Sequence, residues 1–150
     1  MTDEQSKIRN FMLQAEQDCP LQPTWPETDY LKDFRRSLIQ EELNELEDSR
    51  NLVELADAIG DLMYVVIGTA IAYGIDMEPI FNEIHRSNMT KFIDGHKNHH
   101  GKWIKGPSYS PANLKPIIDA QLGIKSPSEE ALDKEHKFRN EQRFTDGEQY

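Results

Sequence analysis

The stretch from residue 41 to residue 61 carries eight carboxylates and one arginine. Acidic residues recur at spacings of three and four on either side of a short break: Glu41, Glu42 and Glu45 before it, and Glu54, Asp57 and Asp61 after it. Residues at these spacings share one face of an α-helix. A short connection favours antiparallel neighbours, so we expect the two carboxylate stripes to face each other in one pocket.

Carboxylates held this close repel one another, and the usual relief is protonation or a bound cation. All-oxygen ligand sets suit hard cations such as Mg²⁺ and Mn²⁺. The second stripe lies on a helix that is apolar around most of its circumference from residue 52 to residue 72, which predicts a buried helix. Glu54, Asp57 and Asp61 therefore favour a metal site, whereas the first stripe alone is typical of a solvated surface.

Apolar residues recur at helical spacing along most of the chain, which predicts an all-α fold, a bundle of about four to five helices. The expected helices cover residues 4–18, 28–47, a third that follows a break at 48–51 and runs to about 73, a segment that opens at 76–78, and a short run at 112–123. Three prolines make residues 19–26 an extended linker, and residues 94–116 are expected to form a loop. We expect one domain over residues 1–124 and a polar tail over residues 125–150.

Gly60 and Gly68 interrupt the third expected helix. An interior glycine costs about 1 kcal/mol relative to alanine. We therefore expect both glycines where two helices approach closely, within a tight bundle or at the seam of a dimer.

Composition limits the kinds of partner. The 150 residues carry a formal net charge of −10, which argues against binding a nucleic acid duplex. The single cysteine, Cys19, fits a reducing compartment, and the N-terminus shows no apolar leader. The most apolar run, Leu62–Tyr73, is too short to span a bilayer. We expect a cytoplasmic protein without a membrane partner.

The sequence from residue 30 to residue 115 resembles the MazG-like, all-α nucleoside triphosphate pyrophosphohydrolases, a superfamily that includes phosphoribosyl-ATP pyrophosphohydrolases and dimeric dUTPases. The resemblance is carried by EExxE at residues 41–45, ExxD at 54–57 and HRSNMTK at 85–91. ELADAIGDLMYVVIGTAIAYGID followed by EIHRSNMTK is similar to a bacterial and phage branch. Only eight residues separate Glu45 from Glu54, fewer than this family usually shows. Its last Asp often sits in a GD pair, so Asp61 can share or replace the role of Asp57.

The resemblance implies hydrolysis of a nucleoside triphosphate to the monophosphate and pyrophosphate, whereas carboxylate spacing alone allows γ-phosphate release equally well. We expect two to three Mg²⁺ or Mn²⁺ ions between Glu42, Glu45, Glu54 and Asp57, with Asp61 as a further candidate ligand. Glu41, or Glu45 where it is not a ligand, is the candidate base for the attacking water. The resemblance also places Asn88 and Lys91 at the nucleotide and implies a homodimer or homotetramer.

Three further residues have two interpretations each. Trp25, in the proline-rich linker, either stacks on a nucleobase or holds the linker to the core. Arg35 either touches a phosphate or forms a surface pair. Lys102 either belongs to a lid over the triphosphate or lies in a solvated loop.

The sequence does not specify the base or the sugar. A deoxynucleoside triphosphate, consumed in pool adjustment or house-cleaning, is the favoured substrate, and phosphoribosyl-ATP is the alternative. A non-catalytic helical oligomerisation or binding module with a vestigial pocket is a second alternative. A di-iron bundle is disfavoured because it needs ExxH pairs, and Glu83 and His85 stand two residues apart.

Overall fold

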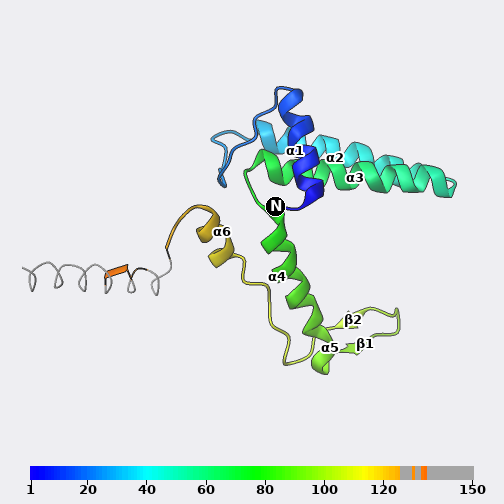
Figure 1. The fold of residues 1–150 in the computed structure, drawn as a ribbon. Helices are drawn as coiled ribbons and strands as arrows, with labels where there is room; N and C mark the ends of the chain where they lie inside the picture. The colour runs from blue at the N-terminus through cyan, green and yellow to red at the C-terminus, as the bar shows by residue number, and fades with distance from the viewer. Residues whose placement is uncertain (126–129, 131–132, 135–150) are drawn as a thin grey trace, which may run out of the picture.

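The computed structural model describes residues 1–125, 130 and 133–134, so most of the tail expected at residues 125–150 lies outside the described residues. In that part the regular secondary structure is helical, apart from one antiparallel two-stranded hairpin (Figure 1). The elements are α1 (Asp3–Gln14), α2 (Tyr30–Asp48), α3 (Leu52–Ala72), α4 (Met77–Met89), the single turn α5 (Lys91–Asp94), β1 (His96–Lys97), β2 (Trp103–Ile104) and α6 (Lys115–Gln121). The all-α prediction is confirmed, and the loop expected at residues 94–116 contains the hairpin.

Side-chain caps begin α3 and α4. Asn51 starts α3 because its Oδ1 accepts hydrogen bonds from the backbone N–H groups of Val53 and Glu54, at 3.0 and 3.1 Å. Asp76 starts α4 by accepting from the N–H of Glu78 at 3.1 Å. Such caps satisfy donors that a helix leaves open in its first turn.

Gly74 ends α3 in the left-handed region, with φ of +69°, which a glycine adopts without a steric cost. A Cβ at this position would overlap the carbonyl group of Gln22 in the proline-rich linker. The linker is also held there by a hydrogen bond from the Thr24 N–H to the Tyr73 carbonyl, at 2.9 Å. Glycine is therefore required both for the turn and for the docking of the linker.

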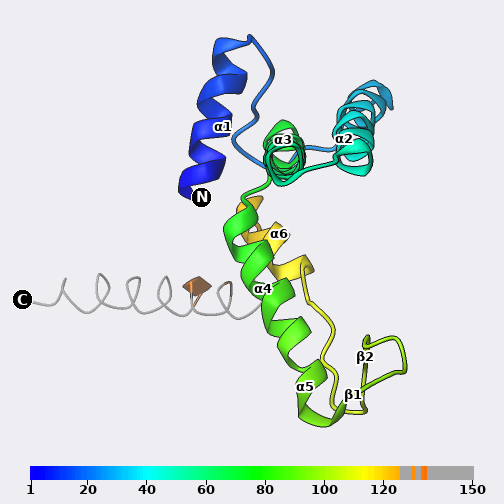
Figure 2. The ribbon, with the colours of Figure 1, turned by 90° about the vertical axis from the view of Figure 1, so that its right-hand side faces the viewer.

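Helices α1, α2 and α3 form a three-helix head. α2 and α3 lie side by side, and α1 crosses α3 (Figures 1 and 2). The core is small, and its buried members Ile8, Met12, Ile71 and Ala72 come from α1 and from the end of α3.

The two glycines of α3 have different surroundings. A Cβ on Gly68 would meet Arg35 Nη1, Met12 Sδ and Ile8 Cγ2 at 3.5 to 3.7 Å, so this glycine lies where three helices approach. At Gly60 no atom of the described residues lies within 4 Å of such a Cβ. The predicted close approach is thus confirmed at Gly68 and is wrong, within one chain, at Gly60.

The prediction that α3 is buried around most of its circumference is wrong for a single chain. Leu52 and Val53 are 82% and 79% exposed and Met63 is 55% exposed. Full burial is concentrated between Gly68 and Ala72. α3 has the length and composition of a membrane span, but its acidic residues lie beside α2, and a bilayer disfavours charged side chains.

The chain leaves the head at the end of α3 and forms an arm, residues 77–104, which consists of α4, α5 and the hairpin and points away from α2 and α3 (Figure 2). The following segment, residues 105–114, runs back along α4 towards α6 (Figures 1 and 2). We call this segment the strap.

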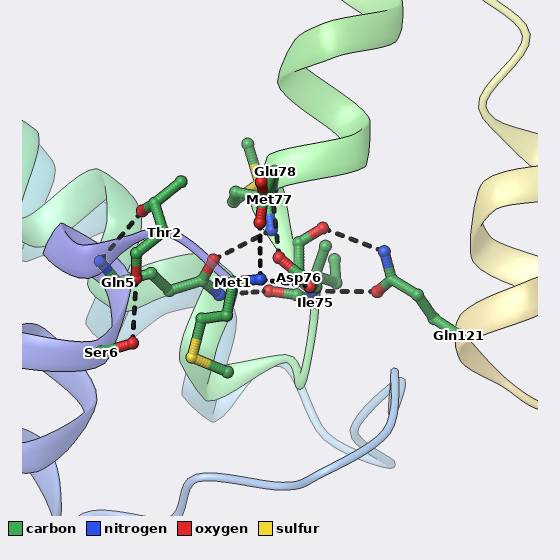
Figure 3. Close-up of polar contacts among 9 residues, drawn as sticks. All are labelled: Met1, Thr2, Gln5, Ser6, Ile75, Asp76, Met77, Glu78 and Gln121. Atoms are coloured by element: carbon green, nitrogen blue, oxygen red, sulfur yellow. Dashed lines mark hydrogen bonds and ion pairs between the residues drawn. The ribbon is translucent and has the colours of Figure 1, made fainter.

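Two glutamines bind the backbone at the joint between α3 and α4 (Figure 3). The buried Gln5 donates to the Ile75 carbonyl at 2.7 Å and accepts from the Met77 N–H at 3.0 Å. Gln121 accepts from the Asp76 N–H and donates to the Asp76 carbonyl, both at 2.9 Å. Each amide uses one donor and one acceptor, so together they fix the direction in which the arm leaves the head.

Candidate active site

Three carboxylates converge where α2 and α3 lie side by side. Glu42 and Glu45, three apart on α2, and Asp61 of α3 offer oxygen atoms that all lie within 4.8 Å of one another. Glu42 is half-buried and the other two are exposed. The short turn between the helices makes them antiparallel, which brings the two stripes into register here.

A second group of carboxylates lies closer to the turn. A cavity of about 230 Å³ is lined by Glu45, Asp48, Ser49, Glu54, Asp57 and Ala58. Glu45 belongs to both groups and connects them. Asp48, which the sequence did not single out, is brought to the cavity because it ends α2.

Glu54 also has a structural contact. One of its carboxylate oxygens accepts the Arg50 N–H at 2.8 Å, while the Glu54 N–H donates to Asn51 at 3.1 Å. This arrangement is a variant of the capping box, in which Glu54 accepts from the residue before the N-cap instead of from the N-cap itself. It holds the Glu54 side chain at the wall of the cavity.

Burial and mutual repulsion make the ionised form of Glu42 less favourable. The pKa of Glu42 is raised, first because partial burial disfavours its charge and then because Glu45, Asp61, Glu41 and Asp57 repel it. None of these carboxylates forms an ion pair with a described residue. The set is uncompensated and offers only oxygen donors, which fits a hard divalent cation.

The structure assigns one aspartate to each group. Asp61 joins Glu42 and Glu45, while Asp57 lines the cavity with Glu54. Glu41 is exposed beside Glu42 and lies outside both groups.

Asn88 and Lys91 lie at the far end of the arm, and the structure does not bring them to the carboxylates of the same chain (Figure 2). Lys91 Nζ donates to Asn88 Oδ1 at 2.6 Å. The two residues are therefore paired with each other across the junction between α4 and α5.

The remaining candidates lie in three different surroundings. The Trp25 indole is 81% exposed and contacts only the Tyr73 ring among described aromatic rings, at 5.9 Å, so no buried indole holds the linker. Arg35 is 6% exposed and donates to Gln17 at 2.9 Å, inside the head, and burial lowers its pKa. Lys102 is exposed on the hairpin.

The strap is a feature that sequence reasoning missed. Four side chains of the arm hydrogen-bond its backbone at 2.8 to 3.0 Å, and the pairs are Glu83 with Asn113, Ser87 with Ser110, Thr90 with Ser110, and Asp94 with Ser108. Partners 14 to 30 residues apart leave no periodic signal in a sequence. These contacts place Lys105 and Tyr109 beside α4.

Comparison with known proteins identifies a family. The phosphoribosyl-ATP pyrophosphohydrolase family matches residues 8–88, from α1 to the end of α4, a span that includes both carboxylate groups and Asn88 but stops short of Lys91. A search of curated proteins finds no match. The match covers more than half of the chain and agrees with the helical fold and the facing carboxylates. This chain belongs to the phosphoribosyl-ATP pyrophosphohydrolase family, within the MazG-like all-α superfamily.

Proposed function

We propose that this protein hydrolyses a deoxynucleoside triphosphate to the monophosphate and pyrophosphate with the help of Mg²⁺ or Mn²⁺, and so adjusts or cleans a nucleotide pool. The observation that carries the proposal is the convergence of Glu42, Glu45 and Asp61 without a cationic partner among described residues, inside a segment that matches a pyrophosphohydrolase family. We expect the protein in the cytoplasm of a bacterium, or of the host if a phage encodes it.

The residues divide the work as follows. Glu42, Glu45, Glu54 and Asp57, together with Asp61, would hold the metal, two to three ions in each site. When bound, such ions neutralise the triphosphate and lower the pKa of a bound water. Glu41, or Glu45 where it is not a ligand, accepts the proton of the water that attacks the α-phosphorus. The bond from the α-phosphorus to its bridging oxygen breaks, and pyrophosphate leaves with the electron pair.

Lys91 and Asn88 bind the nucleotide in this proposal. The Lys91 ammonium offsets charge on the phosphates, and Asn88 donates to a sugar or phosphate oxygen. Trp25, with its exposed indole, remains a candidate to stack on the base. Arg35 has its guanidinium inside the head, so it requires a rearrangement to reach a phosphate, and Lys102 can approach the substrate from the hairpin.

A second copy of the chain completes the site in this proposal, in a homodimer or homotetramer. The arm of one chain holds Asn88 and Lys91 away from its own carboxylates. A largely apolar cavity of about 410 Å³ opens between α1, α3 and α4, where Met63, Val66 and Phe81 are exposed. A partner that covers this face would bury these side chains and can bring its arm to the carboxylates of the first chain.

Phosphoribosyl-ATP is the second candidate substrate, because the matching family is described by it. Its hydrolysis breaks the same bond and would use the same residues. The two candidates differ in what the protein must recognise beyond the phosphates.

A product assay tests the reaction. Purified protein receives each deoxynucleoside and ribonucleoside triphosphate, and phosphoribosyl-ATP, with Mg²⁺ or Mn²⁺, and the nucleotides are separated by ion exchange beside an EDTA control. We expect monophosphate and pyrophosphate from a deoxynucleoside triphosphate, and no product with EDTA. Turnover of phosphoribosyl-ATP alone would establish the second candidate, and diphosphate with phosphate would refute the proposed bond cleavage.

A thermal melt addresses the non-catalytic alternative. A ligand that binds only the folded state raises its stability, so Mg²⁺ should raise the Tm of the wild type. A helical binding module with a vestigial pocket would melt at the same temperature with Mg²⁺ and with EDTA.

A further inference from the structure

Two lysines of the arm and the strap approach one tyrosine. Lys105 Nζ lies 4.1 Å from the centre of the Tyr109 ring, and the Tyr109 hydroxyl lies 3.2 Å from Ser87 Oγ. Lys91 follows Ser87 by one helical turn and is bound to Asn88. The pKa of Tyr109 is lowered, first by its hydrogen bond with Ser87 and then by Lys105 and Lys91, so both lysine charges reach the phenol.

Backbone contacts of the strap hold Lys105 and Tyr109 in place; together with Lys91, we call these residues the cluster. The Tyr109 N–H donates to the Gly106 carbonyl at 3.1 Å and closes a tight turn. A Cβ on Gly106 would overlap the Asp94 carboxylate, so the turn packs directly against Asp94. Asp94 in turn accepts the Ser108 N–H at 3.0 Å. The carboxylate nearest to the cluster in sequence is therefore engaged with the strap backbone.

The charges of the cluster have no carboxylate partner. Neither Lys91 nor Lys105 forms an ion pair with a described residue, although the chain has 27 acidic and 17 basic residues. Residues 85–109 carry five of those basic residues and a single acidic one. Ammonium groups only donate hydrogen bonds, so the cluster suits an anion rich in acceptor oxygens, such as a phosphate chain.

We propose that Lys105 and the Tyr109 hydroxyl bind the pyrophosphate portion of the substrate together with Lys91. The strap thus supplies two phosphate-binding residues that lie outside the segment matching the family, which ends at residue 88. The inference rests on the proposed function, since the cluster meets the carboxylates only if the site is completed by a second copy. Pyrophosphate carries more negative charge than a nucleoside monophosphate, so the two lysines favour the leaving group.

Measuring the affinity for each product separately distinguishes a specific role in pyrophosphate binding from a general loss of affinity. Pyrophosphate and a nucleoside monophosphate are titrated separately by calorimetry, with Mg²⁺ present, into the full-length wild type, Lys105→Gln and Tyr109→Phe. We expect pyrophosphate to bind about ten- to a hundredfold more weakly to Lys105→Gln, which loses a charged hydrogen bond, and about two- to tenfold more weakly to Tyr109→Phe. Monophosphate binding should be unchanged in both.

Lys97→Gln is the matched control. It removes the same charge from an exposed position on β1, outside the contacts that join Lys105, Tyr109 and Ser87, and should bind pyrophosphate like the wild type. Equal weakening by Lys97→Gln and Lys105→Gln would overturn the specific role and leave a nonspecific charge effect. A wild type that binds no pyrophosphate would also overturn it, as would both variants binding normally.

Turnover distinguishes the inference from the proposed function. If the wild type hydrolyses triphosphates and both strap variants keep their pyrophosphate affinity, the strap inference fails while the function stands. If no triphosphate is hydrolysed but Lys105→Gln still loses pyrophosphate, the proposed substrate fails and the strap remains a pyrophosphate site. Where the function stands, Lys105→Gln should raise KM more than it lowers kcat, because it removes binding made before the reaction.

Discussion

Glu54 has two roles, since its carboxylate accepts the Arg50 N–H just before α3 and also lines the cavity beside Glu45. In Glu54→Gln the amide oxygen can still accept the Arg50 N–H, so this contact is kept while a ligand charge is lost. We expect kcat/KM to fall about a hundredfold or more, about 2.7 kcal/mol of transition-state stabilisation, with the metal-free Tm close to that of the wild type. Steady-state kinetics and a melting curve check both parts.

Glu47→Gln provides the control for that experiment. Glu47 is exposed on α2 and belongs to neither carboxylate group, but the substitution changes the net charge by the same amount. Its kcat/KM should match the wild type. Full activity in Glu54→Gln would remove Glu54 from the metal site.

The raised pKa of Glu42 predicts a pH effect on stability. Without metal, ionising this group costs more in the folded than in the unfolded chain, so stability is lost as the pH rises from the ordinary value of 4.5 through the raised pKa. We expect metal-free Glu42→Gln to melt above the wild type at about pH 7 and together with it at about pH 4. Added Mg²⁺ should reverse the order near neutral pH, because only the wild type keeps the full ligand set. A pH-independent difference in Tm would contradict the assignment.

At the scale of elements, the end of α3 depends on a glycine that no other residue can replace. Gly74→Ala meets left-handed strain and an overlap with the Gln22 carbonyl, whereas Gly101 has a φ of +78° and open space around it. Gly101→Ala should therefore cost about 1–2 kcal/mol of strain at most, and Gly74→Ala distinctly more. Equilibrium unfolding in urea measures both, and equal losses would show that the linker yields without cost.

The helices, and the boundaries of α3 and the start of α4, could be predicted from the sequence because their causes are local, whereas α1 ends at Gln14 and not at the expected residue 18. Asn51 and Asp76 are capping residues, Gly74 stops a helix, and the apolar spacing is helical. The exposure of much of α3 could not be predicted. The spacing of apolar residues shows which face of a helix is apolar, but it does not show whether another part of the protein covers that face. The contacts of the strap could not be predicted either. Its hydrogen bonds join side chains of the arm to backbone groups 14 to 30 residues later in the sequence.

The candidate site could be predicted only in part. Glu42, Glu45 and Asp61 come together because one short turn relates their two helices, and a short turn is visible in sequence. Whether Asp57 or Asp61 faces Glu42 depends on the axial register of α2 and α3, which the spacing of the carboxylates alone does not specify. The separation of Lys91 from the carboxylates follows from the joint held by Gln5 and Gln121, which has no sequence signature.

At the scale of the whole molecule, a site shared between chains predicts complementation. Glu45→Gln and Lys91→Ala each damage one half of every site, so each variant should be nearly inactive alone. In a dimer that contains one of each, one site carries both changes and the other carries neither. Co-expression with random pairing should restore about a quarter of the wild-type activity.

That recovery is measured on the co-purified mixture, with the two variants expressed separately and assayed unmixed as controls. Size-exclusion chromatography confirms that all samples have the same oligomeric state. No recovery in the co-purified sample would show that carboxylates and lysine act within one chain, and it would require the arm to fold back onto its own head.

The opposite charges of the stretch 41–61 and the region 85–109 also bear on kinetics. They give each chain a negative end and a positive end, and such ends attract across distances comparable to the Debye length, about 10 Å at 0.1 M salt. Encounters between two chains are then guided into the orientation that sets an arm against a carboxylate face, and dissolved salt weakens that guidance. Ionic strength would thus govern how quickly working sites form after dilution, even where it leaves the chemistry of a finished site unaltered.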